Sequence, residues 1–98
     1  MDQAEAIKIV TAYKALLTKH FTDCKVYLYG SYSKGTAHKD SDIDVAVVVP
    51  QLHSDWWSTS TSLWSLTRQV NTLIEPVLIE ESHPSPLYED ILRTGVRV

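Results

Sequence analysis

The sequence has one cysteine, no basic excess and no long apolar run, and each shortage excludes a class of protein. Because Cys24 is the only cysteine among 98 residues, no internal disulfide can form, which is typical of a reducing compartment. No apolar run approaches membrane-spanning length, and the N-terminus lacks the apolar core of a signal peptide. We therefore expect a cytoplasmic protein that does not cross a membrane.

Positive charge is outnumbered, with 9 Lys and Arg against 12 Asp and Glu. Nucleic-acid-binding domains normally carry a basic excess, so the balance argues against nucleic acid as a partner. It permits a small anionic substrate held by a metal ion. Apolar residues make up 44% and charged residues 21%, as in ordinary globular proteins, and the length fits a single domain over residues 1–98.

The first half of the chain predicts a helix followed by two strands. A helix is expected from about Gln3 to His20, with Asp2 as its N-cap. The β-branched and aromatic run Val26–Tyr29 predicts a short strand, and residues 30–41 a loop with room for one helical turn. The nearly continuous apolar run Ile43–Val49 is typical of a strand covered on both faces.

The second half predicts helix, strand, helix. After a turn at 51–55, a helix capped by Ser54 or Asp55 should run to about Val70, with four candidate buried positions: Trp56, Leu63, Leu66 and Val70. A third strand is expected over Thr72–Ile79, and Pro76 within it indicates an edge or a bulge. A last helix should start at Ser85-Pro86, stop at Gly95, and have three apolar side chains on its buried face: Leu87, Ile91 and Leu92. The order predicts an α/β (α+β) fold, a small mixed sheet flanked by helices.

A Gly-Ser turn and an acidic pair carry the chemical signal. Gly30-Ser31 ends one predicted strand, and Asp42-Ile43-Asp44 opens the next. Strand side chains alternate, so Asp42 and Asp44 should point to the same face. Two such carboxylates repel each other unless a cation lies between them, and Mg²⁺ prefers carboxylate and phosphate oxygens. The pair is therefore a candidate metal clamp.

The Gly-Ser turn adds a candidate phosphate site to this clamp. Gly30 lets the backbone approach a phosphate closely, and an N–H group or the Ser31 hydroxyl can donate to it. Lys34 and Lys39 could neutralise more of a triphosphate, although a solvated loop lysine is the plainer interpretation. Gly30, Ser31 and Lys34 are thus the nucleotide-binding candidates beside the two aspartates.

Gly30-Ser31, ten residues and then Asp42-Ile43-Asp44 together resemble the signature of the DNA polymerase β-like nucleotidyltransferase superfamily, and within it the minimal nucleotidyltransferases. The tail from Ser85-Pro86 to Gly95 is also similar to that family. The resemblance implies the nucleotidyltransferase fold and two magnesium ions bound by three carboxylates. It also implies in-line transfer of a nucleoside monophosphate, AMP from ATP, to an acceptor hydroxyl.

The resemblance places the third carboxylate on the next strand, where Glu75 is the candidate, so Asp42, Asp44 and Glu75 form the implied catalytic and metal-binding set. Alternation puts Glu75 on one face with apolar neighbours: Leu73, Val77 and Ile79. A metal would explain a charge there, but an edge-strand glutamate that faces water is the alternative.

The minimal nucleotidyltransferases also resemble antitoxins of two-gene systems whose toxin is a helical HEPN ribonuclease. This resemblance implies AMP transfer onto a toxin hydroxyl, and the alternative is a non-catalytic antitoxin that neutralises its partner by complex formation. A fragment of a larger polymerase-like or aminoglycoside-modifying enzyme is disfavoured by the length. Three tryptophans could be partly packed side chains or interface anchors: Trp56, Trp57 and Trp64.

Overall fold

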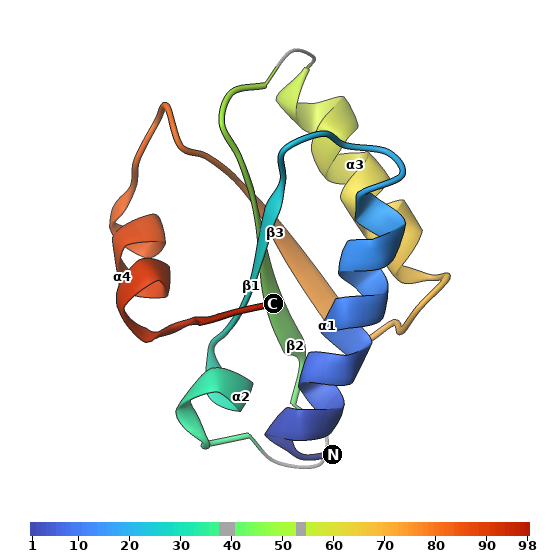
Figure 1. The fold of residues 1–98 in the computed structure, drawn as a ribbon, viewed down its shortest axis with the longest axis vertical. Coiled ribbons are helices and arrows are strands. Elements are labelled where there is room, and N and C mark those ends of the chain that lie inside the picture. Colours follow the sequence, from blue (N-terminus) through green and yellow to red (C-terminus); the bar gives the residue numbers. More distant parts are fainter. Residues whose placement is uncertain (38–40, 53–54) are drawn as a thin grey trace.

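The computed structural model describes residues 1–37, 41–52 and 55–98. Helices and strands follow one another along the chain as α1 (Gln3–Leu17), β1 (Lys25–Tyr29), α2 (Ser31–Lys34), β2 (Ile43–Val49), α3 (Trp56–Thr67), β3 (Ile74–Glu80), α4 (Pro86–Thr94) and β4 (Val96–Arg97) (Figure 1). The predicted order of elements is confirmed, including the single helical turn after Gly30. The short strand β4 was not predicted.

The sheet is mixed, with strand order β3-β2-β1-β4. Strand β1 runs antiparallel to β2 and β4, and β2 runs parallel to β3. Pro76 lies in β3, at the edge of the sheet, where its missing N–H breaks no pairing with an outer strand. The prediction of a small mixed sheet flanked by helices is confirmed.

Helices cover the two faces of the sheet unequally. Figure 1 shows α1 and α3 on one side of the sheet and α4 on the other. The α1–α3 side holds the main core, which includes Val10, Val45 and Leu63, all at most 1% exposed. A smaller cluster on the α4 side contains Tyr27, Ala46, Val48, Ile79, Tyr88 and Ile91. Strand β2 is therefore buried on both faces, as its apolar run indicated.

Side chains and backbone groups close the helix ends where the sequence predicted caps. Asp2 accepts a hydrogen bond from the Glu5 N–H (2.9 Å), and Asp55 accepts one from the Ser58 N–H (2.9 Å). The alternative cap, Ser54, lies outside the described residues. Helix α1 ends at Leu17 rather than at His20, because the N–H of His20 bonds the Leu17 carbonyl (2.9 Å), which tightens the last turn.

Two predictions of burial were wrong. Trp56 is 48% exposed, because it opens α3 one turn before Thr59, the first side chain of the buried stripe. On α4, the buried residues are Tyr88 and Ile91, whereas Leu87 and Leu92 are 40% and 53% exposed. This helix contacts the sheet through a narrow stripe with a spacing of three residues, and the two leucines flank it. Leu63 and Leu66 of α3 are buried or partly buried, as expected. Helix α3 ends at Thr67 rather than at about Val70, and Val70 is partly buried beyond that end.

In the described part of the chain, no helix combines the length and the apolar character that crossing a membrane requires.

Candidate functional site

The strand pairing aligns three polar residues in one row across the sheet. Tyr29, the last residue of β1, pairs with Asp44 of β2, and Asp44 pairs with Glu75 of β3. Directly paired residues point to the same face, so the three side chains lie on the face that α4 partly covers. Asp42 lies two residues before Asp44 and is exposed. The structure thus brings the three carboxylates named from the sequence to one end of one face.

Desolvation and mutual repulsion act on Asp44, which is partly buried, and also on Glu75, although Glu75 is exposed. Burial raises the pKa of Asp44 above its ordinary value, and the negative charge of Asp42 raises it further. The pKa of Glu75 is also raised, first by desolvation, then by the charges of Asp42 and Asp44 and by a hydrogen bond shared with Asp42. Among the described residues, both desolvation and the neighbouring acids disfavour the ionised forms of Asp44 and Glu75. A cation bound among these groups would relieve the repulsion.

Position 30 must be glycine because the Asp44 side chain lies close to its Cα. Its backbone has φ 73° and ψ −147°, a conformation that side chains with a Cβ rarely adopt. A Cβ added at Gly30 would overlap the Asp44 carboxylate. The Gly30 carbonyl accepts hydrogen bonds from Lys34 N (3.1 Å) and Ser33 Oγ (2.9 Å), which hold the turn in place. The glycine and the aspartate of the sequence motif are therefore in direct contact across the β1–β2 pair.

The remaining candidates lie on α2 and in the loop that follows it. Ser31 begins α2 and is partly buried, and Lys34 is exposed near the end of the same helix. Tyr32, between them, is buried in the main core and anchors α2 to it. Gln3 of α1 also donates a hydrogen bond from Nε2 to the Tyr32 carbonyl (3.0 Å). The other candidate lysine, Lys39, lies outside the described residues.

The donor chemistry fits magnesium, but the side chains are not arranged as a ready metal site. Across residues 1–37, 41–52 and 55–98, no group of three or more His, Cys, Asp and Glu side chains could hold a metal ion as it stands. Carboxylate oxygens whose ionisation is disfavoured by their neighbours are nevertheless suitable partners for a hard divalent cation. The three-carboxylate ligand set therefore stays a prediction, and it requires side-chain adjustment.

Sequence reasoning missed Tyr29 as a neighbour of the acidic groups. Burial raises the pKa of its hydroxyl, and the charges of Asp44 and Glu75 raise it further. The residue was visible in the sequence directly before Gly30, but only the antiparallel register of β1 and β2 places it beside Asp44. A hairpin register cannot be read from the sequence when the connection is long.

Two hollows of the described structure lie away from this row. One of about 340 Å³ is lined by the α1–β1 connection and the far end of β2, including Phe21, Pro50 and Leu52. Another of about 480 Å³ runs along α3 and is lined in part by Trp64, Arg68 and Thr72. The carboxylates thus lie outside both of these hollows.

Comparison with known proteins gives a family match and several fold matches. Residues 8–92 match the model of the nucleotidyltransferase domain family. A stretch of 23 residues is 65% identical to protein adenylyltransferase MntA of Shewanella oneidensis, and this stretch covers 24% of the chain but only 16% of that enzyme.

Solved structures resemble the chain over nearly its whole length. A candidate nucleotidyltransferase from Sulfolobus solfataricus superposes with a TM-score of 0.71 at 18% identity, covering 97% of this chain and 80% of that one. A mutant of the MntA–HpeT toxin–antitoxin gives a TM-score of 0.60 at 23% identity, with coverages of 100% and 72%. A toxin–antitoxin structure with AMP-PNP gives 0.55 at 24% identity, with 99% and 72%. At these identities the likeness establishes the fold.

Proposed function

The chain belongs to the nucleotidyltransferase domain family, and from this premise we propose that it transfers AMP from ATP to a hydroxyl group of a protein. The observation that carries the proposal is the contact between Gly30, at the end of β1, and Asp44 on β2. This contact joins a backbone turn suited to phosphate to an acidic group suited to a cation. The local identity to a protein adenylyltransferase supports AMP as the transferred group.

Each residue of the site has a distinct proposed role. Asp42, Asp44 and Glu75 would hold two magnesium ions, which supply charge neutralisation at the phosphates and activation of the acceptor hydroxyl. The backbone at Gly30 and the hydroxyl of Ser31 bind the phosphates, and Lys34 contributes positive charge nearby. Because the reaction is an in-line displacement, holding the donor in place supplies much of the rate.

A partner protein is proposed to carry the acceptor. The MntA–HpeT structures, which share this fold, are toxin–antitoxin assemblies. We propose that the protein is a cytoplasmic antitoxin. Its partner would be a HEPN-type toxin, which is silenced when AMP is transferred to it.

Helix α3 offers a surface that such a partner could contact. The side chains of Trp56, Trp57 and Trp64 are 48%, 72% and 46% exposed. No residue of this helix is charged. The rings of Trp56 and Trp57 lie with their centroids 6.5 Å apart. Exposed aromatic side chains are enriched at protein interfaces, so the surface supports the interface interpretation of these residues.

The test is co-expression with the protein encoded by the adjacent gene, followed by intact-mass measurement of both chains. The proposal expects a complex and a gain of one or more AMP units on the partner, which disappears with Asp44→Asn. A partner of unchanged mass in the presence of ATP and magnesium would refute enzymatic transfer.

A second candidate function is a non-catalytic antitoxin. It is favoured by the exposed tryptophans and by the absence, among the described residues, of a ready three-ligand metal group. The Asp44→Asn variant separates the two functions. If this variant still silences the toxin in a tight complex, binding alone is sufficient.

A further inference from the structure

We propose that Tyr29 is a nucleotide-positioning residue, whose hydroxyl donates a hydrogen bond to a phosphate oxygen of the bound nucleoside triphosphate. The inference rests on the proposed function and adds a contact outside the Gly-Ser and acidic motifs. Its basis is the row Tyr29–Asp44–Glu75 across three strands.

Tyr29 lies where the two halves of the site meet. It immediately precedes Gly30, whose backbone turns toward α2, and it pairs with Asp44 on the neighbouring strand. Its side chain is only partly buried and packs at the margin of the α4-side cluster. A ligand that contacts both the Gly30 turn and the Asp44 carboxylate must therefore pass beside the Tyr29 ring.

The chemistry of the hydroxyl suits a phosphate. Among the described residues, the structure records no hydrogen bond to the Tyr29 hydroxyl, so the group is available to a ligand. A tyrosine hydroxyl is a neutral O–H group that can donate one hydrogen bond to a phosphate oxygen. A phosphate oxygen accepts but does not donate, so the Tyr29 hydroxyl is a complementary partner beside the Gly30 turn. Packing of the ring holds the hydroxyl in place, so little conformational entropy is lost on binding.

Tyr27 provides a control within the same strand. It lies two residues before Tyr29 and therefore on the same face, but it is only 8% exposed and packs with Tyr88 and Ile91 of α4. Its row continues through Ala46 and Val77 and contains no acidic side chain. The same chemical change at Tyr27 thus removes a hydroxyl without touching the proposed ligand.

The experiment compares Tyr29→Phe with Tyr27→Phe, because both variants keep the ring and its packing. The probe is an ATP analogue with a non-hydrolysable bond between the α- and β-phosphates, titrated in magnesium by calorimetry. A hydrogen bond to a charged acceptor contributes about 1.5 kcal/mol, so Tyr29→Phe should weaken binding about tenfold. Tyr27→Phe should stay within about twofold of wild type. In the transfer assay, KM for ATP should rise by the same factor at Tyr29 while kcat changes little.

Several outcomes would overturn the inference. If the two variants bind the analogue as tightly as wild type, the Tyr29 hydroxyl does not contact the nucleotide. If Tyr29→Phe lowers kcat at unchanged KM, the hydroxyl acts on the carboxylates instead. A gain of AMP mass on Tyr29 itself would make it an acceptor. If wild type binds no analogue at all, the proposed function fails together with this inference, whereas failure at Tyr29 alone leaves that function intact.

Discussion

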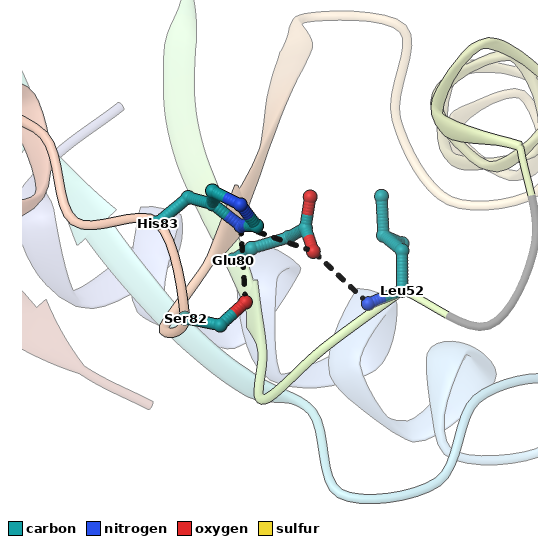
Figure 2. Close-up of polar contacts among 4 residues, drawn as sticks. All are labelled: Leu52, Glu80, Ser82 and His83. Atoms are coloured by element: carbon teal, nitrogen blue, oxygen red, sulfur yellow. Dashed lines mark hydrogen bonds and ion pairs between the residues drawn. The ribbon is translucent and has the colours of Figure 1, made fainter.

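The two ends of the β2–β3 pair both carry acidic side chains. At the far end, Glu80 and Glu81 bond to basic or N–H groups, whereas at the near end the described neighbours of Asp44 and Glu75 include other acids. At the far end, Glu80 Oε2 accepts a hydrogen bond from the Leu52 N–H (3.1 Å) and lies 3.7 Å from Nδ1 of His83 (Figure 2). Glu81 pairs there with Nζ of Lys25 (3.3 Å). At the near end, by contrast, Asp44 and Glu75 face one another and Asp42.

The contrast separates structural acids from candidate functional ones. Figure 2 shows Glu80 between the segment after β2 and the turn after β3, so its carboxylate fastens two loop ends together. At the near end, the described surroundings of Asp44 and Glu75 are other acids and burial, which both raise their pKa values and so disfavour their charge. Such an arrangement lowers stability unless a ligand compensates it, and strain of this kind is typical of functional sites.

The largest expected effect comes from neutralising the near end. Asp42→Asn or Asp44→Asn should lower transfer at least about 1000-fold, because a bound metal supplies several kcal/mol of transition-state stabilisation. The fold should stay intact. Transfer is measured by the gain of AMP mass on the partner.

Glu80→Gln is the matched control at the far end. It removes one carboxylate charge from the same strand pair, and the amide oxygen can still accept from the Leu52 N–H. Transfer should stay within about twofold, and the free energy of unfolding should fall by about 1 kcal/mol or less. If this control loses as much activity as Asp44→Asn, the contrast between the two ends is mistaken.

Glu75→Gln tests whether the metal site includes a ligand from the edge strand β3. If Glu75 is the third metal ligand, Glu75→Gln should lower the transfer rate roughly 100-fold. The free energy of unfolding should change little, because the side chain is exposed. Activity within a few-fold of wild type would make Glu75 a solvent-facing edge residue, and the third ligand would then be unassigned.

Gly30→Ala tests the contact that joins the two motifs, with Gly35→Ala as its control. Both glycines have φ 73°, but a Cβ at Gly30 would overlap Asp44, whereas a Cβ at Gly35 meets nothing within 4 Å. We expect losses in unfolding free energy of about 2–3 kcal/mol at Gly30 and about 1 kcal/mol at Gly35. Urea unfolding monitored by tryptophan fluorescence gives both values, and equal losses would remove the special role of Gly30.

The smallest expected effect is a pH dependence of stability without metal. The pKa of Asp44 is raised in the folded chain by burial and then by Asp42, so the folded state binds this proton more tightly than the unfolded state does. Ionisation therefore lowers stability above the folded pKa, and the penalty vanishes as the pH falls through the folded pKa to the ordinary carboxyl range.

Asp44→Asn removes this titration. In EDTA, the variant should be more stable than wild type near pH 7, and the difference should shrink toward about pH 4. Urea unfolding of both proteins at each pH measures the difference. A difference that grows on acidification would show that the folded state favours the charged form of Asp44.

Local patterns in the sequence determined most of the elements and the acidic motif. The caps at Asp2 and Ser85, the strand that opens with Asp42-Ile43-Asp44 and the edge position of Pro76 depend on residue type and on spacings of two to four residues. Such patterns are visible in a single sequence because strands and helices repeat over those distances.

The tertiary structure decided which local features meet. It placed Tyr29 beside Asp44, brought β4 to the free side of β1, selected Tyr88 rather than Leu87 for burial, and left Trp56 exposed. Each outcome depends on packing between segments distant in the chain, where several registers satisfy the same apolar pattern. Only the requirement that all faces be buried together selects one of them, and that requirement belongs to the whole fold.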